Sequence, residues 1–343
     1  MKKNYVALLV VLFLAPLHAA AECLLTFNTY GPIYASNVHG RGVRLVEEIN
    51  QKNKCDLIHF QEAWSENQIN IFDQGLKNTY KIYEPNRQAR IGLMNFSLRP
   101  WHDAKTYSYR ANYDGNLLDD VRKLVHTKKA FAVLDGALAG TFSINTHLHP
   151  TSDRVRILQL LDLLNWRIAH NSQPIILTGD FNMDPNSFEH AFVMKILNLD
   201  DSMLVVNGSY PNDFCSYCAN NPLGWLSDNH TFDYVFFSQL AADEAGWIPR
   251  QIHLALTGDG RPLSDHYGLK VDFEWSHGST SNVDAEKSKA EMIQILDAAN
   301  SRILGFGPAQ ELGYIALIRR IRAEIMTDQG PYAQYFSQIF KKH

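Results

Sequence analysis

Short apolar runs alternate with amphipathic helical stretches from Cys23 to about Phe273 of this 343-residue chain. Such runs, rich in β-branched and aromatic residues and separated by helical segments, are typical of a layered α/β domain. The predicted strands cover residues 24–30, 57–61, 91–96, 130–134, 140–145, 175–178, 232–237 and 268–273. The predicted helices cover 43–51 and 153–168, and the second has a helically spaced apolar stripe of Ile157, Leu160, Leu161, Leu164 and Ile168.

The first residues have the features of a cleavable signal peptide. Two lysines precede the apolar segment 5–17, and the alanines at 19–21 match a small-residue cleavage site. The apolar segment is shorter than the roughly 20 residues that a membrane-spanning helix needs. We therefore predict a signal peptide over residues 1–21, a mature chain that begins at Glu22, and a secreted or periplasmic location.

The four cysteines are expected to form disulfides, because an exported protein matures in an oxidising compartment. Three pairings are possible for four cysteines. We favour Cys23 with Cys55, because both precede apolar runs that are predicted to be neighbouring strands. Cys215 and Cys218 form a C-x-x-C pair in a predicted loop, for which we favour a local disulfide over a zinc or redox site.

The character of the chain changes after residue 275. Residues 276–284 are polar and small and are predicted to be a linker, and residues 285–343 carry two helical apolar stripes. We expect a C-terminal helical hairpin. Arg319, Arg320 and Arg322 give its second helix a basic patch that suits a membrane surface or a protein partner. We favour the alternative, in which the helices pack on the preceding domain with these arginines in water.

Polar residues with catalytic or ligand chemistry follow most of the predicted strands. In an open α/β sheet the loops at the strand ends meet at a shared cleft. Taken singly each residue is weak evidence, because an Asp or Asn after a strand is more often a turn or helix-cap residue. The residues concerned are Asn28, Glu62, His147, Asp180, Asn182, Asp233, Asp265 and His266.

Their order along the chain is more specific than any one of them. It reads Asn, Glu, His, Gly-Asp-x-Asn, Asp and Ser-Asp-His, with residues 179–182 and 264–266 as its most distinctive parts. This series resembles the endonuclease/exonuclease/phosphatase superfamily over about residues 22–275. The resemblance implies a four-layered α/β sandwich, in which two packed mixed sheets are flanked by helices. It also implies metal-assisted hydrolysis of a phosphodiester by this domain.

By the same resemblance, Glu62, Asn28 and Asp265 are the expected metal ligands. Hydrolysis of an anionic phosphodiester needs a hard cation that offsets charge on the phosphoryl group, and oxygen ligands suit such a cation. We expect Mg²⁺, with Mn²⁺ or Co²⁺ as substitutes.

The resemblance also assigns the proton transfers. His266 is the expected general base, because an imidazole deprotonates water near neutral pH, and either Asp233 or Asp265 orients it. Asp180 and Asn182 are expected to align the water and stabilise charge on the phosphoryl oxygens. His147 is expected to donate to a phosphate oxygen or to assist the leaving group.

Local details make the chain similar to neutral sphingomyelinases. Asp233 is followed by Tyr-Val, where inositol-phosphate phosphatases and DNase-related nucleases commonly have Arg followed by Ile or Val, and residues 145–149 read Asn-Thr-His-Leu-His. The implied substrate is sphingomyelin or another choline phospholipid at a membrane surface, cut to ceramide and phosphocholine. Leu223, Trp225 and Leu226 suit insertion into lipid. We favour their burial against the sheet.

Two alternatives stay open. A secreted nuclease related to DNase I predicts basic residues around the cleft, and Arg122, Lys123, Lys128 and Lys129 are candidates. The net charge of -4 and the pI near 6.4 weigh against nucleic acid, because they supply no global positive field. The second alternative is an exported binding protein without catalysis, which is the less favoured because every expected catalytic position is filled.

Overall fold

The computed structural model describes residues 21–32, 34–85, 90–114, 128–171, 173–238, 244–258, 260–277 and 285–341. Most of the predicted signal peptide, most of the predicted linker, and the candidate basic residues Arg122 and Lys123 lie outside these ranges. No helix within the described ranges is long and apolar enough to cross a membrane.

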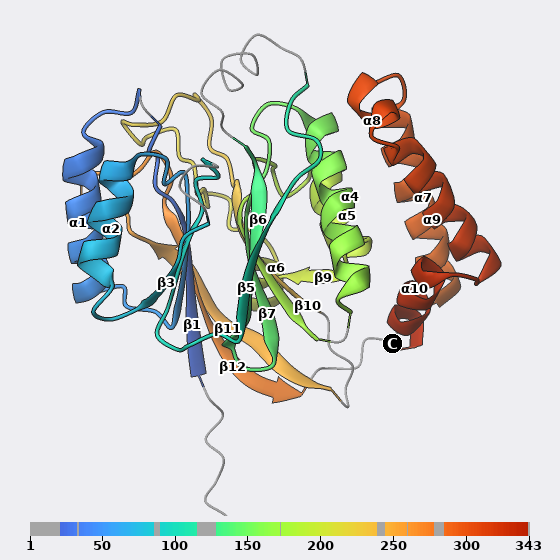
Figure 1. The fold of residues 1–343 in the computed structure, drawn as a ribbon, viewed down its shortest axis with the longest axis horizontal. Coiled ribbons are helices and arrows are strands. Elements are labelled where there is room, and N and C mark those ends of the chain that lie inside the picture. Colours follow the sequence, from blue (N-terminus) through green and yellow to red (C-terminus); the bar gives the residue numbers. More distant parts are fainter. Residues whose placement is uncertain are drawn as a thin grey trace, which may run out of the picture.

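Two six-stranded mixed sheets form the centre of the molecule (Figure 1). The first has the order β11-β12-β1-β2-β4-β3, with bounds β1 Ala21–Asn28, β2 Leu57–Gln61, β3 Lys81–Tyr83, β4 Met94–Ser97, β11 Ala245–Ala255 and β12 Gly268–His277. The second has the order β5-β6-β7-β8-β10-β9, with bounds β5 Asp103–Ser108, β6 Ala130–Leu138, β7 Thr141–His147, β8 Ile175–Asp180, β9 Leu199–Asp201 and β10 Asp233–Ser238.

The alternation of side chains along the strands builds the layers. Leu24 of β1 packs in a core between the sheets, together with Ile176 of β8, whereas Leu25 points to the opposite face of its sheet. In the same way Leu177 packs away from Ile176, against the helices on the second sheet. The result is the predicted sandwich of two packed sheets.

Helices cover the outer face of each sheet (Figure 1). The helices α1 (Val38–Gln51) and α2 (Glu66–Leu76) pack on the first sheet, and α4 (Asp153–Ala169) and α5 (Phe188–Lys195) pack on the second. A shorter helix, α6 (Ser202–Asn207), follows β9. The helix at 153–168 was predicted almost to its bounds, whereas α1 begins five residues before the predicted start, behind its cap Asn37.

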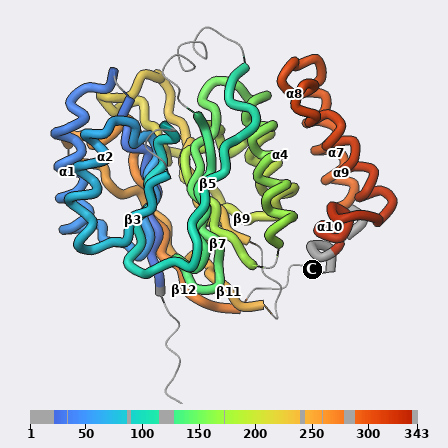
Figure 2. Tube along the Cα trace, in the orientation of Figure 1, coloured from blue at the N-terminus to red at the C-terminus, as the bar shows by residue number. Residues whose placement is uncertain are grey.

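The C-terminal helices form a further layer outside α4 (Figures 1 and 2). They are α7 (Ala285–Ile303), α8 (Gly307–Glu311), α9 (Tyr314–Thr327) and α10 (Pro331–Lys341). The pair α7 and α9 carries the two predicted stripes, and α8 and α10 were not predicted. Tyr314 donates a hydrogen bond to Asp162 of α4 at 2.7 Å, and Tyr332 donates one to Asn165 at 2.6 Å. The helices therefore pack on the preceding domain.

The end of β12 and the arginines of α9 each bear on what was predicted for the C-terminal region. Strand β12 continues through Ser276 and His277, past the predicted boundary at 275. In the predicted basic patch, Arg320 pairs with Glu324 and Arg322 pairs with Asp297, both at 2.8 Å. Contact of these helices with a membrane or a partner stays a prediction.

Both expected disulfides are present. Cys23 at the start of β1 is joined to Cys55, just before β2, and Cys215 is joined to Cys218. The first disulfide joins the starts of two neighbouring parallel strands, which pair from Leu24 with Leu57 onward.

Candidate active site

Strand register brings the predicted site residues together at one end of the sandwich. In the second sheet His147 of β7 pairs with Asp180 of β8, and Asp180 pairs with Asp233 of β10. In the first sheet Asn28 of β1 pairs with Gln61 of β2, and Glu62 is the next residue after this pair. Strand pairing therefore places the residues of each sheet side by side, and the packing of the two sheets brings the two rows together.

Asp180 lies at the centre of the cluster and is almost fully buried. Its Oδ2 accepts a hydrogen bond from Asn28 Nδ2 at 2.8 Å, and lies 3.5 Å from His147 Nε2 and 3.8 Å from His266 Nε2. Burial raises the pKa of Asp180 to about 6; His266 lowers it and Asp233 raises it. One carboxylate thus links the two sheets and both histidines.

Glycine at position 179 allows this close approach of β7 and β8. Its φ is +138°, and a Cβ there would lie 1.9 Å from the carbonyl oxygen of Thr146. Any other residue would push the two strands apart just where His147 and Asp180 pair. This explains the glycine of the Gly-Asp-x-Asn series in steric terms.

His266 and Asp233 form a buried pair. The Nδ1 atom of His266 lies 2.7 Å from Oδ2 of Asp233, and both side chains are nearly inaccessible to water. Burial by itself lowers the pKa of the imidazole, but Asp233 and Asp180 raise it more, so it lies well above the usual histidine range. Of the two carboxylates considered for orienting His266, Asp233 makes the contact, whereas Asp265 accepts a hydrogen bond from Ser264 at 3.1 Å.

Of the three expected metal ligands, Glu62 and Asp265 interact through their charges, and Asn28 pairs with Gln61, which directly precedes Glu62. Burial raises the pKa of Asp265 to about 6; His266 lowers it and the charge of Glu62 raises it. Two carboxylates that repel each other, beside the amide of Asn28, fit a hard cation, because Mg²⁺ commonly binds one or two carboxylates and keeps several waters. The described residues contain no group of three or more His, Cys, Asp or Glu arranged to hold a metal. The fit therefore rests on two carboxylates and an amide.

Two of the predicted residues have a strained backbone. Glu62 has a φ of +57° and Asn182 a φ of +51°, a left-handed conformation that residues other than glycine adopt uncommonly. Such conformations persist where surrounding contacts enforce them, and they are frequent at active sites. For Asn182 the contacts are its backbone N–H, which donates to Asp180 at 2.9 Å, and its side chain, which donates to the carbonyl of Leu148 at 3.1 Å.

Lys129 lies in the site, although the sequence analysis did not predict it there. It was a candidate only as one of several basic residues for a nuclease. The structure buries it just before β6, with its Nζ 2.6 Å from His147 Nε2 and 5.8 Å from the centre of the Trp64 ring. A buried ammonium here supplies positive charge for an anionic phosphodiester. Its neighbour Lys128 is exposed.

An exposed aromatic surface lies beside the cluster. Trp225 is 74% exposed, Tyr34 is 71% exposed and Leu226 is 46% exposed, so the expected burial of Trp225 and Leu226 is wrong; Leu223 is partly buried. The Trp225 indole donates to the hydroxyl of Tyr30 at 2.9 Å, which anchors it two residues beyond Asn28. Trp225 and Leu226 are exposed because the loop that carries them is hydrogen-bonded to the 264–267 turn and its tip lies in solvent.

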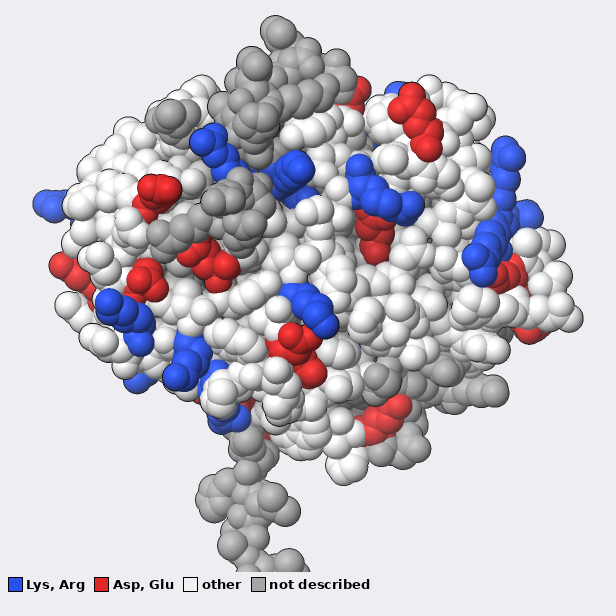
Figure 3. Space-filling view, viewed as in Figure 1, with Lys and Arg blue, Asp and Glu red and all other residues white. Residues whose placement is uncertain are grey.

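Basic and acidic side chains are interspersed on the face of the molecule that Figure 3 shows. Such a surface offers a nucleic acid backbone less long-range attraction than a continuous basic patch would.

Known proteins resemble the chain in sequence and in fold. The profile of the Endonuclease/Exonuclease/phosphatase family matches residues 25–266. Human sphingomyelin phosphodiesterase 2 is 23% identical over an alignment of 322 residues, which covers 84% of this chain and 73% of the human protein.

Solved structures share the fold at lower identity. An endonuclease/exonuclease/phosphatase from Bacteroides vulgatus superposes with a TM-score of 0.58 at 18% identity, covering 75% of this chain and all of the other. A truncated Caenorhabditis elegans TDP2 gives 0.57 at 17% identity, covering 74% and 97%. Sphingomyelinase C from Streptomyces griseocarneus gives 0.53 at 15% identity, covering 74% and 99%.

Proposed function

Because the chain belongs to the endonuclease/exonuclease/phosphatase family, we propose that it is an exported, Mg²⁺-dependent phosphodiesterase that hydrolyses sphingomyelin, or another choline phospholipid, to ceramide and phosphocholine. The observation that carries the proposal is the buried pair of His266 and Asp233 beside Asp180. Two disulfides support an exported protein, because such bonds persist mainly in oxidising compartments.

The chain's own residues account for activation of water. His266 Nε2 and Asp180 Oδ2 are 3.8 Å apart, so one water molecule can contact both atoms. His266 then takes a proton from that water at Nε2, while Asp233 holds the ring through Nδ1 and stabilises the imidazolium that forms. The oxygen of the water attacks phosphorus, and the bond from phosphorus to the ceramide oxygen breaks. The departing ceramide oxygen takes a proton from solvent, and His266 returns its own proton to solvent.

Positive and hydrogen-bonding groups stabilise the phosphoryl oxygens as charge develops on them. Lys129 supplies such a positive group: its Nζ lies 2.6 Å from His147 Nε2, which in turn lies 3.5 Å from Asp180 Oδ2. Glu62, Asp265 and Asn28 would hold a divalent cation, which would offset further charge on the phosphoryl group and lower the pKa of the His266 imidazole.

A lipid substrate is favoured by two observations. The human relative is named as a sphingomyelin phosphodiesterase. The exposed surface of Tyr34, Trp225 and Leu226 adjoins the cluster through Tyr30, and an indole suits the boundary between water and the bilayer. A nuclease has less support, because the net charge of -4 supplies no global positive field.

The test compares two substrates under identical conditions. Purified protein is incubated with sphingomyelin vesicles or with plasmid DNA, in Mg²⁺ or in EDTA, beside a Glu62→Gln variant. We expect release of phosphocholine from the vesicles in Mg²⁺ only, reduced at least a hundredfold in Glu62→Gln, with the plasmid intact. Nicked plasmid with untouched lipid would replace the lipid substrate by nucleic acid. No hydrolysis of either would favour the non-catalytic binding protein.

A further inference from the structure

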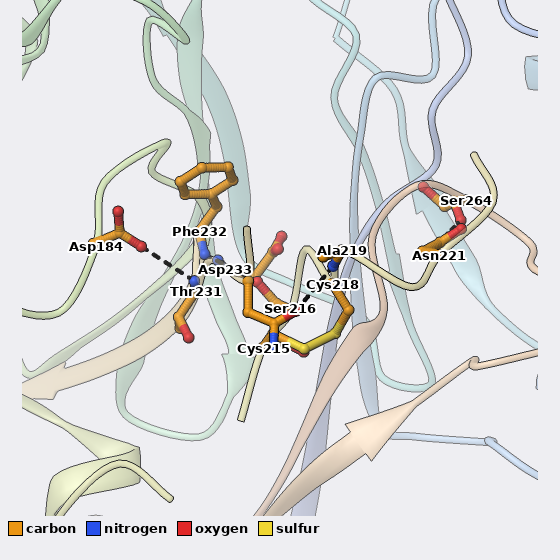
Figure 4. Close-up of a disulfide and its surroundings, with 11 residues drawn as sticks. Asp184, Cys215, Ser216, Cys218, Ala219, Asn221, Thr231, Phe232, Asp233 and Ser264 are labelled. Carbon is orange, nitrogen blue, oxygen red and sulfur yellow. Dashed lines mark hydrogen bonds between the residues drawn. A yellow bond between two sulfur atoms is a disulfide. The ribbon is translucent and has the colours of Figure 1, made fainter. Parts of the chain in front are cut away.

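The loop closed by Cys215 and Cys218 contacts the two segments that carry the His266–Asp233 pair (Figure 4). Ser216 lies between the two cysteines and is fully buried. Its Oγ accepts hydrogen bonds from the backbone N–H groups of Phe232 at 2.9 Å and Asp233 at 3.1 Å. The start of β10, where Asp233 stands, is therefore tied to this serine.

Ser216 also contacts the segment that carries His266. Its carbonyl oxygen accepts a hydrogen bond at 2.7 Å from the backbone N–H of Tyr267, directly after His266. One residue thus bridges the backbone beside both members of the pair, whose side chains meet at 2.7 Å. A small displacement of Ser216 must change the separation or the angle of these two side chains.

Tyr217 and Asn221 of the same loop also contact the segment around His266. The ring of Tyr217 packs edge-on against the His266 imidazole, with ring centres 5.1 Å apart. Asn221 is buried and donates a hydrogen bond to the carbonyl of Ser264 at 2.9 Å. The loop therefore contacts the Ser264–Tyr267 turn at three points.

The disulfide at this loop adds little to stability through chain entropy. It joins cysteines only three positions apart, whereas Cys23 and Cys55 are 32 apart, and a short closed loop restricts the unfolded chain far less. Its main effect is on the folded state, where it fixes the backbone on both sides of Ser216.

We infer that Ser216 is a positioning residue and that the Cys215–Cys218 disulfide holds it in place, so that this loop sets the geometry of the His266–Asp233 pair. The inference rests on the proposed function for its catalytic consequence, but not for the geometry. It applies whichever phosphodiester is the substrate.

The first experiment measures kcat and KM for Ser216→Ala. The control is Ser202→Ala, another fully buried serine, whose hydroxyl has no hydrogen-bond partner among the described residues. We expect kcat to fall on the order of tenfold in Ser216→Ala with KM nearly unchanged, because a small displacement of a catalytic group lowers the rate of the chemical step. Ser202→Ala should keep the kcat of the unsubstituted protein. Equal kcat values in the two variants would refute the role of Ser216.

The second experiment removes each disulfide in turn. Replacing Cys215 and Cys218 by alanine should lower kcat as Ser216→Ala does. Replacing Cys23 and Cys55 by alanine should lower thermal stability more while leaving kcat of the folded protein unchanged. The inference would be overturned if kcat fell only in the variant that lacks Cys23 and Cys55.

A spectroscopic readout separates this inference from the substrate. The Nδ1 proton that His266 shares with Asp233 should give a far-downfield proton resonance, to be identified by its loss in His266→Gln. We expect it to broaden or shift in Ser216→Ala and to persist in Ser202→Ala, even if sphingomyelin is not hydrolysed. If Ser216→Ala fails to fold, Asn221→Ala provides the same test through Ser264. An unchanged resonance in the folded variants would refute the inference, whereas inactivity of the unsubstituted protein would refute only the proposed function.

Discussion

Replacing His59 should make the protein more resistant to acid. This histidine is fully buried between the two sheets, with Nδ1 2.6 Å from Thr178 Oγ1 and Nε2 3.2 Å from Ser143 Oγ. Burial lowers the pKa of its imidazole to about 3, because the charged ring would lose its hydration. In the unfolded chain the same ring titrates near its usual value of about 6.5.

The sign and size of the effect follow from these two pKa values. Between pH 6.5 and pH 3 the unfolded chain binds a proton at His59 and the folded chain does not, so stability falls as the pH falls. At pH 5 the difference of about 1.5 units between the pH and the unfolded pKa corresponds to a loss of about 2 kcal/mol. The contribution is fully present above pH 6.5.

Urea unfolding at pH 7 and pH 5 measures this loss. His59→Gln removes the titration but keeps a side chain that can hydrogen-bond. Between pH 7 and pH 5 the free energy of unfolding of this variant should therefore fall by about 2 kcal/mol less than that of the unsubstituted protein. His253→Gln, at an exposed position of β11, controls for the loss of a histidine as such. An equal pH dependence in the unsubstituted protein and His59→Gln would refute the reasoning.

Three further predictions concern the site. Lys129→Met should lower kcat/KM roughly a hundredfold, because it removes a buried positive charge, whereas exposed Lys128→Met should change it little; equal losses would contradict the placement of Lys129. Trp225→Ala should weaken binding to sphingomyelin vesicles about tenfold in a flotation assay, whereas Trp275→Ala on β12 should not. Millimolar Mg²⁺ should raise the melting temperature, and no shift would contradict a metal site formed by the two repelling carboxylates.

Much of the site was predictable because its residues stand at strand ends. His147 and Asp180 end β7 and β8, whereas Asp233 begins the antiparallel strand β10, and strand pairing places the three in one row. The order of these residues also carried the resemblance that indicated the fold. What the order left open was the orienting carboxylate, because Asp233 and Asp265 precede His266 at distances along the chain that say nothing of contact.

Other features depend on tertiary packing that periodicity does not encode. Adjacent lysines at 128 and 129 look alike in sequence, and only the register of β6 decides that Lys129 is buried. The strands β3 and β9 have three residues each, too few for an alternating pattern. Trp225 was expected to be buried because large apolar residues usually are, but its loop is held by Asn221 and Ser216 with the tip outward.

In the proposed reaction, water attacks phosphorus of a choline phospholipid in this cluster. The most direct test is hydrolysis of sphingomyelin in ¹⁸O-labelled water with Mg²⁺, followed by mass spectrometry of both products, beside His266→Ala. We predict one ¹⁸O atom in phosphocholine and none in ceramide, with turnover lost in the variant. Label in ceramide, or undiminished turnover in His266→Ala, would contradict the account.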